Sequence, residues 1–350
     1  MSDERILRVA VIGCGKVSQN MHLPALAKSS RCQLVAVCDQ SREVAAAVGD
    51  RYSISRVYDS VEAVLGDDLV DAVILAIGDP LHVPIAKQVL EAGKHVLVEK
   101  PLGTSAAECH ELRDTLEATG LKLQVGLMKR HDPGLQYARY AARELIGPTL
   151  SFSAWYRACA DRYVDESSVF LPVIRDPTYA RPAYKLDRQP YYLATHGAHL
   201  FDTVRFVVGA PRSVRAIFGQ RGDTYSWHGL LRTEAEAVGH FDLAVYVESD
   251  WSEGMTVFGE RGSLRIDLPN PFFLLPGQVR VFDADSASWR TPRFDQGDPY
   301  LRQLDAFAAS ALDDAPVSAD VEDGIAAMEM IEAVEASVAS GGAEERLGDE

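Results

Sequence analysis

Two closely spaced glycines at the end of an apolar run constrain the fold of this chain more than any other feature. Residues 9–18, Val-Ala-Val-Ile-Gly-Cys-Gly-Lys-Val-Ser, predict a buried strand, a tight turn and the start of a helix. Gly13 permits the turn, and Gly15 lets the backbone approach a pyrophosphate at the helix N-terminus. Ser18 holds the third glycine position and is small enough for the helix to pack on the strand. The run therefore predicts a dinucleotide-binding turn.

Apolar runs and helical patterns alternate through the first third of the chain. The runs are rich in Val and Ile and have no polar face, which favours a parallel sheet covered on both sides. They fall at residues 8–13, 33–39, 71–77, 95–99 and 121–126. Between two of them, residues 84–93 have helical spacing and end in glycine. We expect an α/β fold in which residues 1–127 form a Rossmann domain, a doubly wound parallel sheet.

The pattern changes after residue 127 to stretches in which apolar and polar residues alternate. These stretches lie at 150–157, 213–218, 237–248 and 262–268, and they predict strands with one buried and one wetter face. Helices are expected at 198–208, 300–312 and 320–339. We therefore expect residues 128–340 to form a substrate-binding and oligomerisation α/β domain with an open, mostly antiparallel sheet. Residues 341–350 are polar, and we expect them to fray.

The nature of the dinucleotide depends on Asp39, which ends the second predicted strand. A carboxylate there accepts hydrogen bonds from a ribose and repels a 2′-phosphate, which favours NAD over NADP. Arg42 is a counter-argument, because a nearby arginine can accommodate that phosphate. We expect NAD and do not exclude NADP.

Glu99-Lys100-Pro101 follows the strand predicted at 95–99. A lysine before a rigid proline at the carboxyl end of such a strand directs its amine toward the crevice where these folds hold ligands. Burying an amine without a function is costly. Lys100 is therefore a candidate catalytic residue.

The composition of the chain limits which kinds of partner it can bind and indicates where in the cell it is located. The formal net charge of −16 argues against nucleic acid and anionic membranes as partners, although acidity also aids solubility. The five cysteines are scattered and form no CxxC pair, so we expect neither disulfides nor a metal site. The polar N-terminus has no hydrophobic signal region, and no run is apolar enough to span a bilayer. These features indicate a cytoplasmic protein.

Taken together, these motifs resemble the Gfo/Idh/MocA family, the relatives of glucose–fructose oxidoreductase and inositol dehydrogenase. The most specific stretch is Ala-Gly-Lys-His-Val-Leu-Val-Glu-Lys-Pro-Leu-Gly-Thr-Ser at 92–105. Others are the glycine turn with His-Leu-Pro at 22–24, Arg-His-Asp-Pro at 130–133, Gly-Ala-His-Leu-Phe-Asp at 197–202, and Phe-Gly-Glu-Arg-Gly-Ser-Leu at 258–264. The resemblance implies nicotinamide-dependent redox chemistry on sugars or cyclitols, in homodimers or homotetramers that associate through the open sheet face.

The resemblance also implies roles for individual residues. Lys100 would hydrogen-bond the reacting hydroxyl, and His199 would be the general base in oxidation. The family usually has an aspartate four residues before this histidine, whereas this chain has Thr195. Thr195 can orient a hydroxyl but carries no charge. His196 is an alternative participant, because residues at i and i+3 lie on neighbouring parts of one helix face.

The remaining predicted site residues line either the cofactor or the substrate. For the cofactor they are Gly13, Cys14, Gly15, Lys16, Val17, Asp39, Arg42, Ala76, Ile77, His82, Glu99 and Lys100, with His22 as support. For the substrate they are Lys100, Arg130, Trp155, Arg157, Thr195, His196 and His199. The basic and aromatic segment 158–192 is either a substrate-recognition lid or an oligomer contact.

Three functions are compatible with these residues. We expect an NAD-dependent dehydrogenase that oxidises a secondary hydroxyl of a sugar or cyclitol. An alternative is a redox-neutral lyase, hydrolase or epimerase that uses bound NAD transiently, which the Thr195 departure suggests. A regulatory protein that binds NAD without turnover is a third, less favoured because Lys100 and His199 are both present.

Overall fold

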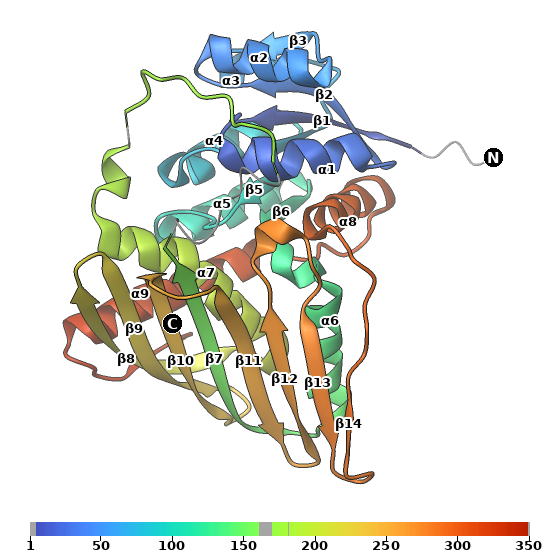
Figure 1. The fold of residues 1–350 in the computed structure, drawn as a ribbon. Helices are drawn as coiled ribbons and strands as arrows, with labels where there is room; N and C mark the ends of the chain where they lie inside the picture. The colour runs from blue at the N-terminus through green and yellow to red at the C-terminus, as the bar shows by residue number, and fades with distance from the viewer. Residues whose placement is uncertain (1–4, 161–169, 181, 349–350) are drawn as a thin grey trace. The chain divides into compact units, whose positions relative to one another are not determined.

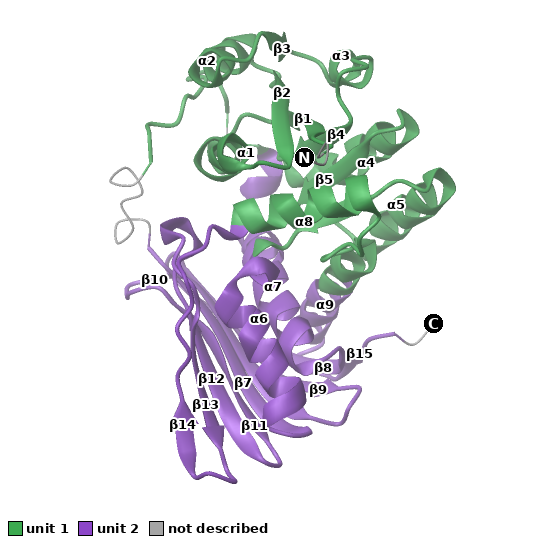
Figure 2. Cartoon of the chain, turned by 90° about the vertical axis from the view of Figure 1, so that its right-hand side faces the viewer, with its two compact units in different colours: residues 1–128, 170–182, 300–328 green, residues 129–169, 183–299, 329–350 purple. Residues whose placement is uncertain are grey.

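The computed structural model describes residues 5–160, 170–180 and 182–348. The chain divides into two compact units, which are coloured separately in Figure 2. Unit 1 contains residues 1–128, 170–182 and 300–328, and unit 2 contains 129–169, 183–299 and 329–350. Unit 1 thus includes two later segments that the sequence assigns to the C-terminal domain.

The described strands of unit 1 form a six-stranded parallel sheet in the order β3-β2-β1-β4-β5-β6 (Figure 1). The strands are β1 Leu7–Ile12, β2 Cys32–Cys38, β3 Arg56–Tyr58, β4 Ala72–Leu75, β5 His95–Glu99 and β6 Leu123–Gly126. Their apolar side chains are almost fully buried, as expected of a sheet covered on both faces. Strand order reverses between β1 and β4, so the ligand crevice of such a fold opens at the carboxyl ends of these strands.

Helices connect or follow these strands, and several of the helix ends carry the expected capping signals. A π-helical turn, Ser18–His22, precedes α1 Leu23–Lys28, and the other helices are α2 Arg42–Tyr52, α3 Val61–Leu65, α4 His82–Glu91, α5 Ala106–Thr119 and α8 Pro299–Asp313. Ser41 caps α2 by accepting from the Val44 amide. Ser105 and Glu108 form a capping box at the start of α5.

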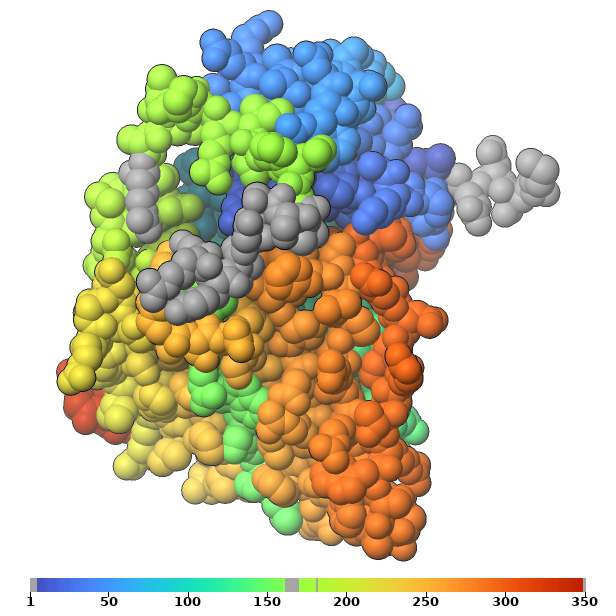
Figure 3. Space-filling model, viewed as in Figure 1, coloured from blue at the N-terminus to red at the C-terminus, as the bar shows by residue number. Residues whose placement is uncertain are grey.

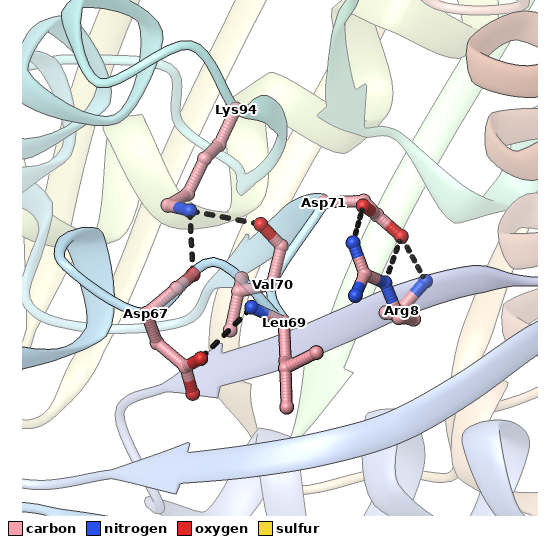
Figure 4. Close-up of polar contacts among 6 residues, drawn as sticks. All are labelled: Arg8, Asp67, Leu69, Val70, Asp71 and Lys94. Atoms are coloured by element: carbon pink, nitrogen blue, oxygen red, sulfur yellow. Dashed lines mark hydrogen bonds and ion pairs between the residues drawn. The ribbon is translucent and has the colours of Figure 1, made fainter.

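Charged side chains at the amino edge of this sheet are satisfied by each other and by loop carbonyls (Figure 4). Arg8 Nε, at the start of β1, lies 2.8 Å from Asp71 Oδ2, which directly precedes β4. The buried Lys94 amine precedes β5 and donates to the carbonyls of Asp67 at 2.9 Å and Val70 at 2.8 Å. These charges hold the loops at the edge opposite the crevice.

Unit 2 contains a sheet in which nine described strands run in the order β14-β13-β12-β11-β7-β10-β9-β8-β15 (Figure 1). The strands are β7 Thr149–Cys159, β8 Pro211–Arg221, β9 Thr224–Thr233, β10 Val238–Val247, β11 Ser252–Gly259, β12 Gly262–Leu268, β13 Gln278–Asp283, β14 Ser288–Arg290 and β15 Glu345–Arg346. Only β7 and β10 pair in parallel among these described strands. Helices α6 Pro133–Tyr140 and α7 Arg188–Val208 pack on one face, and α9 Val321–Ala339 contributes to both units. The fold class predicted from the sequence is confirmed.

Two details differ from the sequence expectations. Helix α7 begins at Arg188, well before residue 198, because Tyr192 and Leu193 extend its buried face. The closing residues were expected to fray, but Glu345 and Arg346 pair with strand β8 as β15. That prediction is wrong for these residues, since the turn at Gly341 and Gly342, both at positive φ, returns the chain to the sheet edge.

No helix within the described residues combines the length and the apolar character that crossing a bilayer requires.

Candidate dinucleotide and catalytic sites

The glycine-rich turn lies where β1 and β4 end side by side. The Gly13 amide donates to the Cys38 carbonyl at 2.8 Å, and Gly13 has a φ of +93°. A Cβ atom at Gly13 would lie 2.2 Å from the carbonyl oxygen of Ala76 and 2.8 Å from Ile77 Cγ2. Only glycine fits this conformation and this close approach. The structure thus brings Gly13 together with Ala76 and Ile77, two more of the residues expected to line the cofactor.

Gly15 borders open space. A Cβ atom there would meet no heavy atom within 4 Å, and both Gly15 and the adjacent Lys16 are exposed. Val17, which is half-buried, leads into the helical turn at Ser18. Backbone amides beside an open, glycine-bordered space fit the pyrophosphate of a dinucleotide.

Asp39 is oriented by main-chain donors at the end of β2. Its Oδ2 accepts from the Cys14 amide at 2.9 Å, and its Oδ1 accepts from the Ser41 amide at 2.9 Å. Burial raises the pKa of the Cys14 thiol to about 12, so this side chain stays a neutral packing group. Arg42, in contrast, is 80% exposed, and its Nη1 lies 3.0 Å from Asp59 Oδ2. Arg42 is therefore engaged away from Asp39.

Glu99 is a buried carboxylate directly before Lys100. Its Oε1 lies 2.8 Å from His22 Nε2, and its Oε2 accepts from the Lys100 amide at 3.2 Å. Burial alone would raise the pKa of Glu99, but the hydrogen bond and charge of His22, together with Lys100, hold it below its usual value. Tyr300 packs edge-on against the His22 ring at 5.3 Å. Glu99 is therefore a fixed negative group directly before the half-buried Lys100.

His82 joins the turns that follow β4 and β5. Its Nδ1 lies 2.7 Å from the Pro101 carbonyl, and its Nε2 lies 3.3 Å from the Ile77 carbonyl. The Lys100–Pro101 peptide bond is cis. His82 thus supports the backbone on both sides of the predicted cofactor crevice, and His22 supports Glu99. These contacts suit a positioning role for both histidines.

In unit 2, the two α7 histidines meet one buried tyrosine. His196 Nδ1 lies 3.2 Å from the hydroxyl oxygen of Tyr156 on β7, and the His199 ring stacks on Tyr156 with centroids 6.2 Å apart. His196 and His199 therefore both face Tyr156 from α7. Thr195, half-buried, precedes them on the same helix.

A buried ion pair supports this tyrosine. Lys129 Nζ forms a salt bridge with Glu253 on β11 and lies 4.6 Å from the Tyr156 ring centroid. Both charged side chains are almost fully buried. Burial raises the pKa of Glu253, and the charge of Lys129 opposes that shift. Sequence reasoning missed Lys129 and Glu253, although Lys129 adjoins the Arg-His-Asp-Pro motif that it did single out. From the stretch 155–157 it selected Trp155 and Arg157 but not Tyr156.

Two predicted substrate contacts, Trp155 and Arg157, are not brought together with these histidines. Side chains alternate along β7, so Trp155 and Arg157 lie on the sheet face opposite Tyr156. Arg265 covers the Trp155 ring at 4.8 Å, and Arg157 Nε lies 2.8 Å from an Asp242 carboxylate oxygen. Arg130 is buried, and its Nε donates to Asp202 at 3.0 Å. These contacts favour structural roles over the predicted ones.

The long segment 158–192 divides between the two units. Arg162 and Tyr163 lie outside the described residues. Residues 170–180 belong to unit 1. Tyr184, Lys185 and Tyr191 contact one another in unit 2, where Arg188 pairs with Asp223. Among the described residues, no group of three or more His, Cys, Asp or Glu side chains could hold a metal ion.

Comparison with known families identifies both parts of the chain. Residues 7–127 match the Gfo/Idh/MocA oxidoreductase family profile described as an NAD-binding Rossmann fold. Residues 192–344 match the profile of the C-terminal α/β domain of the same oxidoreductase family. The two matches together span most of the chain. NAD binding, predicted from the glycine turn and Asp39, is thus confirmed.

Individual relatives match along nearly their whole length. An inositol 2-dehydrogenase of Rhizobium meliloti is 24% identical over 348 residues, which cover 95% of this chain and 97% of that protein. A D-xylose 1-dehydrogenase (NADP+) of Haloferax volcanii is 24% identical, with 96% of this chain and 98% of that protein covered. A solved oxidoreductase of Agrobacterium radiobacter, in complex with NAD+, L-tartaric acid and magnesium, superposes with a TM-score of 0.80 at 18% identity, covering 98% of each chain.

Proposed function

This chain belongs to the Gfo/Idh/MocA oxidoreductase family, and from that premise we propose that it oxidises a secondary hydroxyl of a sugar, cyclitol or sugar derivative with NAD. The observation that carries the proposal is the placement of Lys100. It follows β5 on the same sheet edge as the glycine turn and Asp39, directly after the buried Glu99. Relatives named as inositol and xylose dehydrogenases support the substrate class.

Unit 1 supplies the groups that would hold the dinucleotide. Residues 13–17 would bind the pyrophosphate, Asp39 the ribose, and Ala76 and Ile77 would line the crevice. The bound nicotinamide supplies an acceptor for the hydride. Lys100 would donate a hydrogen bond to the reacting oxygen and stabilise the negative charge that develops there.

Unit 2 supplies the proposed proton acceptor. His199 would take the hydroxyl proton in oxidation and return it in reduction. Tyr156 limits how both histidine rings of α7 can turn, because it stacks on one and hydrogen-bonds the other. Relatives are expected to orient the histidine with an aspartate at the position of Thr195. In this chain the uncharged Tyr156 would orient the His199 ring instead. His196, whose Nδ1 faces Tyr156, would position substrate or Tyr156 rather than accept the proton.

We expect His199→Asn to lower kcat for oxidation by about 10²-fold, since general base catalysis contributes ~10²–10⁴-fold. Only neutral imidazole accepts a proton, so the rate of the unsubstituted enzyme should rise with pH on its acidic side. That rise should be absent in His199→Asn. His196→Asn is the matched control and should keep it, with kcat within about tenfold. If His196→Asn loses the pH dependence and His199→Asn keeps it, the two roles are exchanged.

The reaction type can be tested with purified protein, NAD or NADP, and panels of inositols, aldoses, sugar phosphates and glycosides. Nicotinamide absorbance and product mass should be followed together. Reduced cofactor that accumulates in proportion to an oxidised product is the expected result. Product without a change in absorbance would instead establish the redox-neutral alternative, and tight NAD binding without any turnover would favour a regulatory role.

We also propose that copies of the chain associate through the open face of the unit 2 sheet. Exposed apolar side chains Ile217, Leu230 and Phe258 lie on its strands, among charged residues. Light scattering of the purified protein should give a dimer or tetramer mass, whereas a monomer at micromolar concentration would contradict this assembly. The five cysteines are free, which fits a cytoplasmic location that cell fractionation can test.

A further inference from the structure

A segment distant in sequence lies against the glycine-rich turn of unit 1. We call residues 170–180 the ribose strap. The buried Gln19 side chain, 5% exposed, donates to the Cys14 carbonyl at 2.7 Å and to the Ile174 carbonyl at 2.8 Å. Its Oε1 accepts from the Ile174 amide at 2.8 Å. One buried amide thus ties the strap to the dinucleotide turn, and Figure 3 shows yellow-green atoms of the strap over the blue N-terminal residues.

A second attachment places a carboxylate beside the ribose acceptor. Asp176 Oδ2 accepts from the Ser41 hydroxyl at 2.7 Å, and Asp176 Oδ1 accepts from the Thr178 amide at 2.8 Å. The hydrogen bonds from Thr178 and Ser41 lower the pKa of Asp176, so this group is negative at neutral pH. Ser41 also donates its amide to Asp39. The carboxylates of Asp39 and Asp176 are therefore both hydrogen-bonded to Ser41.

The strap also contacts Asp39 directly. The Tyr179 hydroxyl donates to Asp39 Oδ1 at 3.1 Å. Burial, followed by the nearby Asp39 charge, raises the pKa of Tyr179 to about 12, so the phenol keeps the proton it donates. The strap is held at its other end as well, where Arg51 Nη2 donates to the Pro172 carbonyl at 3.1 Å. Asp39 thus accepts hydrogen bonds both from Cys14 of the glycine-rich turn and from Tyr179 of the strap.

We propose that the ribose strap completes the adenosine end of the dinucleotide site and that Asp176 is a specificity-determining residue that favours NAD over NADP. A 2′-phosphate would add close to two negative charges beside Asp39 and Asp176. Two arginines near Asp39 are engaged elsewhere, Arg42 with Asp59 and Arg51 with the strap backbone and Gln19. Arg175, which is exposed on the strap, is tested separately below. This inference rests on dinucleotide binding by unit 1 and does not depend on the polyol substrate.

The test is a charge series at position 176. Asp176→Asn keeps the size of the side chain and can still bond Ser41 and Thr178, and Asp176→Lys reverses the charge. Binding of NADH and NADPH should be titrated by the fluorescence of the reduced nicotinamide, without substrate. We expect NADPH affinity to rise about tenfold in Asp176→Asn, further in Asp176→Lys, and less at high salt, while NADH affinity stays within about threefold.

Asp114→Asn on α5 is the matched control, because it removes an exposed carboxylate of unit 1 outside the strap. It should leave the ratio of the two affinities unchanged. An unchanged ratio across the Asp176 series, or a parallel change for both cofactors, overturns the proposal. So does a loss of NADPH affinity in Arg175→Gln without a gain in Asp176→Asn, since the strap would then favour the phosphate. Failure of the unsubstituted protein to bind NADH would instead contradict dinucleotide binding itself.

Discussion

Replacing Lys100 with methionine is expected to lower kcat/KM for the polyol by about 10³-fold while NADH affinity changes by less than about fivefold. Methionine keeps the unbranched shape of lysine but removes the ammonium group that would stabilise the developing alkoxide. Steady-state oxidation kinetics give the first quantity, and titration by NADH fluorescence gives the second. Together they separate a catalytic role of Lys100 from a role in cofactor binding.

Lys87→Met on α4 is the matched control for this variant. Lys87 belongs to the same unit, and its amine lies 3.2 Å from Glu111 on α5. The same loss of charge there should leave kcat/KM within about twofold, because surface pairs contribute little. Normal turnover by Lys100→Met would contradict the role proposed for Lys100. A parallel loss of turnover and NADH binding would move Lys100 to the cofactor instead.

The cofactor side of the site could be predicted because its determinants are local in sequence. The turn at Gly13, the carboxylate of Asp39 and the amine of Lys100 each follow directly from the end of a strand. In a parallel sheet the carboxyl ends of strands share one edge, so recognising the strands is enough to bring these residues together. The contacts of Cys14 with Asp39 and of Gly13 with Ala76 follow from that arrangement.

The substrate side of the site was less predictable, because it depends on which residues of β7 point to the helix-covered face of the sheet. An alternating strand gives the same pattern whichever face is buried, and a shift of one residue exchanges the two faces. The sequence therefore favours Trp155 and Arg157, whereas Tyr156 between them contacts His196 and His199. The apolar pattern of α7 does not show which strand the helix packs on, so it could not identify the buried face of β7.

Contacts between residues far apart in the chain had no sequence signal. Gln19 and Ile174 belong to segments that no local pattern connects, so the segment 158–192 suggested a lid or an oligomer contact and not the ribose strap. Lys129 and Glu253 are similarly separated. Charged residues are rarely buried without a partner, so burial of Lys129 or Glu253 could be predicted only once the other residue was known to lie beside it.

The buried Lys129–Glu253 pair of unit 2 is expected to be sensitive to the loss of either partner. Removing one partner leaves the other charge buried, which costs about 3–5 kcal/mol. We expect Glu253→Leu and Lys129→Met each to lower the free energy of unfolding by that amount. Glu253→Leu should have the larger effect, because burial already raises the pKa of Glu253 and lets it become neutral when Lys129 is removed. All four tryptophans lie in unit 2, so urea unfolding followed by their fluorescence reports on this unit.

The double variant decides whether the charges act as a pair. Lys129→Met with Glu253→Leu buries two apolar side chains, and it should recover most of the stability that each single variant loses. Asp223→Asn, which breaks the exposed pair with Arg188, is the control and should cost less than about 1 kcal/mol. If the losses of the two single variants simply add in the double variant, the pair is not coupled. The stability of unit 2 would then depend on the packing of each side chain around Tyr156 and Trp251, and not on charge neutralisation.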